Sequence, residues 1–134
     1  MKRRTFLGGA MAVAVVGQGS RALAQQPPIK IGMSMPQTGG LAGGGKASLL
    51  GIEIWRDDIN AKGGLMGRKL TVITEDNRSE PQEAVTVYRK MISSDNVNVF
   101  ISGCVSAGNF AAAPIVVRAQ IPMVLCSILP QNPD

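Results

Sequence analysis

The sequence predicts an α/β fold in which helices cover both faces of a parallel sheet. Four strand-like segments alternate with three helix-like segments along the chain. Glycine and proline mark most of the connections between them. The composition is that of a packed chain, since 45% of the residues are hydrophobic and 17% are charged. Such an alternation is typical of parallel sheets, because parallel strands need long crossover connections, which helices supply.

The first half of the pattern contains two strands and one long helix. Residues 29–35 alternate apolar with small or polar side chains, and a glycine-rich loop follows over residues 36–45. Apolar side chains then recur at helical spacing over residues 46–62. The expected buried face of this helix carries Ala47, Leu50, Gly51, Ile54, Trp55 and Ile59. The glycines at residues 63–64 end the helix, and residues 69–75 form the second strand.

The second half repeats the alternation. Ser79, with Gln82 three residues later, predicts a capping box at the start of the second helix. The expected buried stripe of that helix is Ala84, Val85, Tyr88, Met91 and Ile92. Residues 97–102 are expected to form the third strand, residues 106–120 the third helix, and residues 121–126 the fourth strand.

The first 24 residues predict a cleavable export signal that is not part of the fold. A basic N-terminal region precedes a short apolar run over residues 6–16. A small-x-small cleavage site that ends at Ala24 then follows. Residues 3–7 resemble a twin-arginine signal, and an ordinary secretory leader is the alternative. We therefore expect cleavage near Ala24, a linker over residues 25–28, and a mature protein that works outside the cytoplasm.

Composition excludes several kinds of site. The chain has no histidine for a nucleophile pair or a zinc site, and its two cysteines are too few for a four-thiolate metal site. After the leader, the chain has 10 Lys and Arg residues and 9 Asp and Glu residues. The net charge therefore gives no reason to expect nucleic-acid binding. Residues 40–46 fit the GxxxxGK pattern, but Ala47 lacks the hydroxyl that nucleotide-binding loops use for Mg²⁺. We expect no metal, cofactor or nucleotide.

The predicted topology brings three loops to one edge of the sheet, namely residues 36–45, 103–109 and 127–132. In open parallel sheets, ligands bind beyond the carboxyl ends of the strands, where the strand order reverses. Ser106 opens the third helix, where free N–H groups and the positive end of the helix dipole suit an anion. As an N-cap, the same serine would satisfy these amides without any ligand.

Cys104 and Cys126 fall at the carboxyl ends of strands that are expected to be neighbours. In an oxidising compartment, this placement allows a disulfide, which export of a folded chain would not favour. The alternative is that both cysteines are small buried apolar side chains.

Several stretches of the chain resemble a known family. They are residues 29–32, 38–39, 51–53, 59–69, 103–106, 113–114 and 121–122. In this order they resemble the first lobe of exported type I solute-binding proteins, the receptors of ABC importers for branched-chain amino acids and related small molecules. The resemblance implies that residues 29–134 are a partial N-terminal ligand-binding lobe of a periplasmic, non-enzymatic protein.

The resemblance also implies the ligand-binding positions, which match Ser106, Ala107, Ser127, Gly44 and Thr38. In the family, a serine at the start of the third helix and small or hydroxyl residues after the fourth strand hold the ligand's α-carboxylate. Here Ala107 replaces a second serine, and Gly44 replaces an aromatic residue of the first loop. The missing groups leave room for a bulkier or less zwitterionic ligand, such as an aromatic acid or an amide.

The function that the resemblance implies is capture of a small molecule for import. The expected ligand is a branched-chain or other amino acid, or a related amide or aromatic acid. The expected partners are the ABC permease subunits of the inner membrane. A ligand-sensing domain of a membrane receptor with the same fold is the alternative function.

Overall fold

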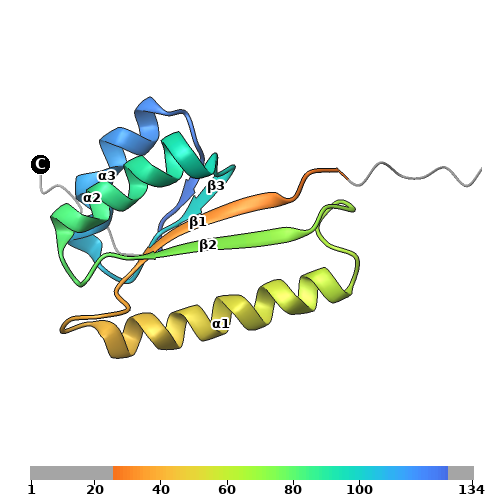
Figure 1. Ribbon diagram of the computed structural model, residues 1–134, viewed down its shortest axis with the longest axis horizontal. Coiled ribbons are helices and arrows are strands. Elements are labelled where there is room, and N and C mark those ends of the chain that lie inside the picture. Colours follow the sequence, from red (N-terminus) through yellow and green to blue (C-terminus); the bar gives the residue numbers. More distant parts are fainter. Residues whose placement is uncertain (1–25, 127–134) are drawn as a thin grey trace, which may run out of the picture.

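The structure, a computed structural model, describes residues 26–126. Strands and helices alternate along the chain (Figure 1). The elements are β1 (Ile29–Met35), α1 (Ala42–Ala61), β2 (Leu70–Asp76), α2 (Pro81–Lys90), the π-helical turn η1 (Met91–Asp95), β3 (Val99–Ile101), α3 (Ser106–Arg118) and β4 (Met123–Val124). The predicted export signal and Ser127 lie outside the described residues.

The four strands form one parallel sheet in the order β2-β1-β3-β4. β1 pairs with β2 along its whole length, from Ile29 opposite Leu70 to Met35 opposite Asp76. α1 covers one face of the sheet, and α2 packs beside α3 on the other face (Figure 1). The predicted parallel sheet with helices on both faces is therefore confirmed.

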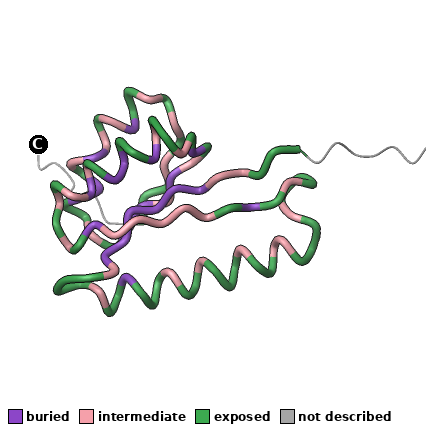
Figure 2. The backbone as a smooth tube through the Cα atoms, viewed as in Figure 1, coloured by how far each residue is buried: buried purple, intermediate pink, exposed green. Residues whose placement is uncertain are grey.

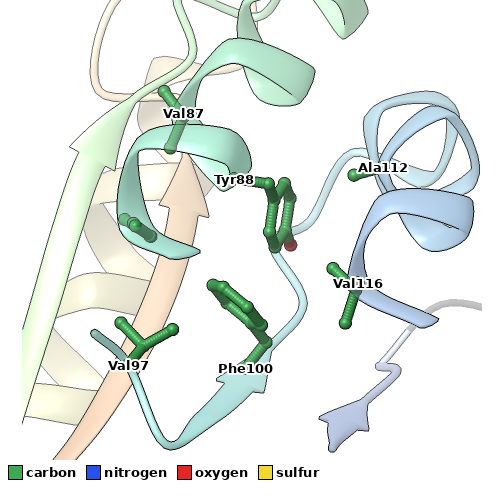
Figure 3. Packing of buried hydrophobic residues seen from close by; sticks show 7 residues of the cluster. Val87, Tyr88, Val97, Phe100, Ala112 and Val116 are labelled. Carbon is green, nitrogen blue, oxygen red and sulfur yellow. The ribbon is translucent and has the colours of Figure 1, made fainter. Parts of the chain in front are cut away.

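Tyr88 and Phe100 are central to the core beneath α2 and α3 (Figure 3). Their ring centroids are 4.9 Å apart, and the rings meet edge to face at 63°, a favourable aromatic arrangement. The other buried members of this cluster are Val87, Met91, Val97, Ala112 and Val116. Gly32 of β1 makes room for the phenyl ring, because a Cβ at Gly32 would lie 2.6 Å from Phe100.

A second apolar cluster lies between the sheet and α1. Its buried members are Ile31, Met33, Met35 and Leu70, against which α1 packs the half-buried Leu49, Ile52 and Ile59. Figure 2 shows α1 as a mostly exposed helix whose inward side alone is covered. Gly45 is its one buried residue, and a Cβ there would lie 1.9 Å from the carbonyl oxygen of Pro36. A glycine therefore sets how closely α1 approaches the loop after β1.

The predicted buried face of α1 is wrong except at Ile59, which packs against the sheet. Leu50 and Ile54 are 59% and 61% exposed, and Ala47, Gly51 and Trp55 are also exposed. The inward stripe instead runs through Gly45, Leu49, Ile52, Arg56 and Ile59. Apolar side chains occupy a wide arc of this helix, so periodicity alone does not select the side that faces the sheet. The close approach of Gly45 to the Pro36 carbonyl, which only a glycine allows, determines which side of α1 faces the sheet.

The predicted capping box at Ser79 is also wrong. α2 begins at Pro81, and its N-cap residue, Glu80, makes no side-chain capping bond. The Ser79 hydroxyl instead donates to the Thr38 carbonyl at 2.9 Å and accepts from the Leu41 N–H at 3.1 Å. It therefore joins the loops that follow β1 and β2.

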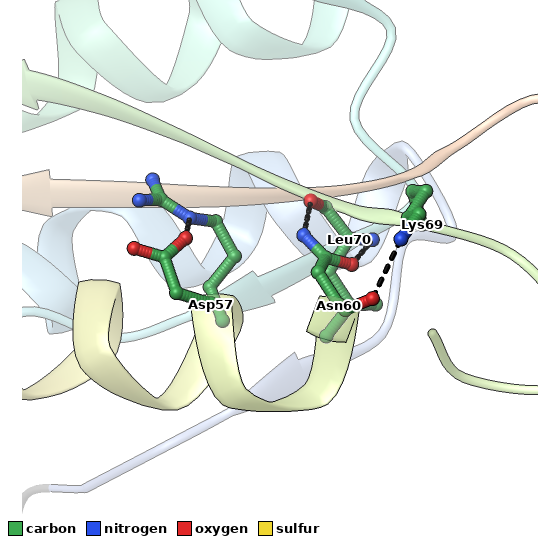
Figure 4. A network of polar contacts seen from close by, with 5 residues as sticks. Asp57, Asn60, Lys69 and Leu70 are labelled. Atoms are coloured by element: carbon green, nitrogen blue, oxygen red, sulfur yellow. Dashed lines mark hydrogen bonds and ion pairs between the residues drawn. The ribbon is translucent and has the colours of Figure 1, made fainter. Parts of the chain in front are cut away.

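Asn60 ties the end of α1 to the start of β2 (Figure 4). Its side-chain amide donates to the Leu70 carbonyl at 2.9 Å and accepts from the Leu70 N–H at 2.7 Å. The Lys69 ammonium donates to the Asn60 carbonyl at 2.6 Å. These bonds fix the turn between α1 and β2.

None of the described helices is long and apolar enough to cross a membrane.

Candidate functional site

The strand order reverses between β1 and β3. From β1 the chain passes through α1 to β2 on one side, and it then crosses back over β1 to reach β3 on the other side. The connection after β1 leads to α1 on one face of the sheet, whereas the connection after β3 leads to α3 on the opposite face (Figure 1). Diverging connections of this kind leave a crevice at the carboxyl edge of the sheet, where ligands of open α/β sheets bind.

A pocket of about 490 Å³ lies at this edge, beside α1. Met33 and Met35 of β1, Ile101 of β3 and Ile52 of α1 form its apolar part. Trp55, which the sequence places in the core, is instead 41% exposed and also lines the pocket. The size and the largely apolar lining are those of a small-molecule site.

The polar end of the pocket is formed by Ser48, Ser102, Cys104, Ser106 and Cys126. Ser106 is the exposed first residue of α3, and Val105, in an extended conformation, is the N-cap. The predicted N-cap role of Ser106 is therefore wrong, and its hydroxyl has no hydrogen-bond partner among the described residues. The first turn of a helix also leaves N–H groups without intrahelical acceptors. The hydroxyl and these amides can together receive a carboxylate.

Buried polar bonds hold the loop between β3 and α3. The Ser102 hydroxyl accepts from the Cys126 N–H at 2.8 Å, and the Asn109 amide donates to the Gly103 carbonyl at 2.9 Å. The Tyr88 hydroxyl lies 3.4 Å from the Asn109 side-chain oxygen, and burial raises the pKa of Tyr88 to about 12. Gly103 lets the loop touch β1, because a Cβ there would lie 2.1 Å from a β1 carbonyl oxygen.

Asp76, at the end of β2, holds the loop that follows β1. Its carboxylate accepts from the Gln37 N–H at 2.8 Å, the Thr38 N–H at 3.2 Å, the Thr38 hydroxyl at 2.6 Å and the Arg78 N–H at 2.8 Å. These bonds, that of the Thr38 hydroxyl foremost, lower the pKa of Asp76 to about 2. Thr38 is thus bound to Asp76 and does not line the pocket.

The other predicted site residues have different places. Gly44 lies exposed in the first turn of α1, which begins at Ala42, so the GxxxxGK segment is helical where a phosphate-binding loop would be needed. Ala107 is exposed beside Ser106 but does not line the pocket. Ser127 lies outside the described residues. Ligand contacts by these residues stay predictions. Sequence reasoning missed Ser48 and Ser102 because neither belongs to a recognisable motif.

A family model described as periplasmic binding protein matches residues 28–133, which include every described strand and helix. The chain belongs to the periplasmic binding protein family. The resemblance inferred from the sequence is thereby confirmed.

Curated relatives of this periplasmic binding protein chain carry names that refer to amino acids. An amino acid binding protein of Pseudomonas aeruginosa is 30% identical over 90% of this chain. The Leu/Ile/Val-binding protein of Escherichia coli K12 is 31% identical over 92% of this chain. The chain spans about a third of the length of these relatives, 32% in both cases.

Solved structures agree with this assignment. The branched-chain amino acid transporter substrate binding protein LivJ from Streptococcus pneumoniae, in complex with isoleucine, has a TM-score of 0.73 and is 31% identical, and the match covers 79% of this chain and 30% of LivJ. A solute binding protein of an ABC transporter from Rhodopseudomonas palustris BisB5, in complex with 3,4-dihydroxy benzoic acid, has a TM-score of 0.66 and is 29% identical, and the match covers 74% of this chain and 26% of that protein.

Proposed function

We propose that this chain is part of the N-terminal ligand-binding lobe of an extracytoplasmic solute-binding component of an ABC importer. The observation that carries the proposal is the pocket at the reversal of strand order, apolar on one side and bordered by Ser106 and the start of α3 on the other. The family membership and the names of the relatives support it. The role is to bind a solute without transforming it.

The chemistry of the pocket favours a small carboxylate with an apolar body. The carboxylate would meet the Ser106 hydroxyl and the first amides of α3, while the apolar body would lie against Met33, Ile52 and Trp55. Among the described lining residues there is no Asp or Glu to pair with an ammonium group. An aromatic acid therefore suits this pocket better than a zwitterionic amino acid does, and a branched-chain amino acid is the next candidate.

The proposal includes a location and a partner. The predicted leader, with cleavage near Ala24, would carry the protein to the periplasm. There it would deliver the solute to the ABC permease subunits of the inner membrane, as the transporter names of the structural relatives suggest.

Intrinsic fluorescence tests the proposal directly, because Trp55 is the only tryptophan of the chain and lines the pocket. We expect benzoate and leucine to change this fluorescence saturably, benzoate at lower concentration, and calorimetry to give the same order. Ser106→Ala should weaken benzoate binding about tenfold, the effect of losing one hydrogen bond to a charged group. Affinities are expected to be weak in absolute terms, because much of the pocket lining is exposed.

Ser94→Ala is the matched control, since Ser94 is an exposed serine on η1 and does not line the pocket. We expect it to bind benzoate as the unmodified chain does. The proposal fails if neither ligand class binds, or if both serine variants have the affinity of the unmodified chain.

A further inference from the structure

Two cysteines line the same pocket. Cys104 follows β3 and Cys126 follows β4, and both are free and exposed. β3 and β4 are neighbours, with Ile101 opposite Val124 as the last pair of their ladder. Cys104 comes three residues after Ile101, and Cys126 comes two residues after Val124.

The segments that carry the two cysteines lie side by side. Both cysteines line one pocket, each just beyond the end of one of two neighbouring strands. Disulfides join residues whose Cα atoms are roughly 4.4–6.8 Å apart. The N–H of Cys126 donates to the Ser102 hydroxyl at 2.8 Å, so the segment after β4 is bonded to the segment after β3, two residues before Cys104. The described residues contain no group of three His, Cys, Asp or Glu side chains that could hold a metal.

We propose that Cys104 and Cys126 form a reversible disulfide in the wall of the pocket, and that this bond weakens ligand binding. One thiolate attacks a disulfide donor, forms a mixed disulfide and releases the first donor thiol. The second thiolate attacks the protein sulfur of the mixed disulfide and releases the second donor thiol. The donor receives two electrons and two protons, and the protein loses two hydrogen atoms.

The effect on binding follows from the position of Cys104. Its sulfur lies 3.2 Å from the Ser48 hydroxyl of α1, and Ser106 follows only two residues later. A bond to Cys126 exchanges the contact with Ser48 for one with the segment after β4 and draws the loop that carries Ser106 with it. The regulatory part of the inference therefore rests on the proposed function, whereas formation of the bond does not. Since coupling between two binding equilibria is reciprocal, a bound ligand should also oppose oxidation.

The test treats the reduced chain with oxidised glutathione and follows its mass without reductant. We expect the chain to lose two hydrogen atoms, to keep no glutathione and to lose both alkylatable thiols. Cys104→Ser and Cys126→Ser should each retain one glutathione, because the resolving thiol is missing. A lasting glutathione adduct on the unmodified chain, or a disulfide-linked dimer, overturns the inference.

A second measurement titrates the reduced and oxidised chains with benzoate in a calorimeter. We expect about tenfold weaker binding by the oxidised chain, equivalent to one lost hydrogen bond to a charged group. Benzoate should also slow oxidation of the unmodified chain. Equal affinities overturn the regulatory step. If the bond forms but neither chain binds, the disulfide stands, and the proposed function is overturned together with its regulation.

Discussion

At the residue scale, single polar side chains hold the loops around the pocket. Asp76 receives four hydrogen bonds from the loop after β1 and from Arg78, and Asn109 bonds the carbonyl of Gly103 from within α3. Both side chains satisfy backbone groups that no strand or helix satisfies. The carboxyl edge of the sheet is therefore ordered mainly by a few side chains that reach across it.

The pKa of Asp76 gives a test of this role. Its folded value, about 2, lies below the ordinary value of 3.8, so the carboxylate stabilises the fold above about pH 4 and loses this contribution as the pH falls through about 2. We expect Asp76→Asn to lower the free energy of unfolding at neutral pH by about 1 kcal/mol, the effect of an exposed charge-assisted bond after solvent screening. Denaturant unfolding at several pH values measures it.

The difference between the unmodified chain and Asp76→Asn should shrink as the pH is lowered from 4 to 2. Glu53→Gln, at an exposed position of α1, is the control and should leave the free energy of unfolding nearly unchanged. A pH-independent difference for Asp76→Asn would contradict the assigned role.

At the scale of the element, α1 shows how one close contact orients a whole helix. Gly45 lies against the carbonyl of Pro36, which turns Leu49 and Ile52 towards the sheet and leaves Leu50 and Ile54 exposed. Trp55 then lies at the border between the covered and the open side, where it can line the pocket. The orientation of α1 thus decides which of its residues line the pocket.

Two adjacent glycines of α1 should respond oppositely to the same substitution. Gly45→Ala places a Cβ 1.9 Å from the Pro36 carbonyl oxygen, and we expect overpacking to lower the free energy of unfolding by about 1–3 kcal/mol. Gly44 has no atom within 4 Å of such a Cβ, so Gly44→Ala should raise the free energy by up to about 1 kcal/mol through helix propensity. Thermal and urea unfolding compare the two variants, and effects of the same sign would contradict the orientation of α1.

At the scale of the whole molecule, the sheet separates two apolar clusters of different character. The cluster beneath α2 and α3 is closed around Tyr88 and Phe100, whereas the cluster beneath α1 opens into the pocket. The first cluster stabilises the molecule, and the second gives part of its apolar surface to the wall of the pocket. Met33 and Met35 belong to both the second cluster and the pocket.

Two phenylalanines test this division. Phe100 is fully buried and Phe110 is 39% exposed. We expect Phe100→Ala to lower the free energy of unfolding by about 3–5 kcal/mol, the usual cost of a cavity of this size. Phe110→Ala should cost about 1 kcal/mol or less, because it removes little buried surface. Equal costs in denaturant unfolding would show that the core does not centre on Phe100.

Local pattern and connectivity were enough to predict the four strands in order, their parallel arrangement and the edge that carries the pocket. The first strand was predicted with its observed bounds, Ile29–Met35. Alternating hydrophobicity and glycine punctuation are local properties, and the crossover rule converts them into topology. Ser106 lines the pocket for the same reason, since a helix that follows a parallel strand begins at its carboxyl edge, and its contact with a ligand stays a prediction.

The orientation of α1, the exposure of Trp55 and the bond between Thr38 and Asp76 could not be predicted in this way. Each depends on atoms from segments far apart in the chain. A helix with apolar side chains around much of its circumference has no preferred buried side before it packs against a neighbour. A hydroxyl such as that of Ser79 forms hydrogen bonds with whichever groups the fold brings near. Packing between distant segments determined the buried side of α1 and the partners of these hydroxyls, because it alone supplies the competing contacts.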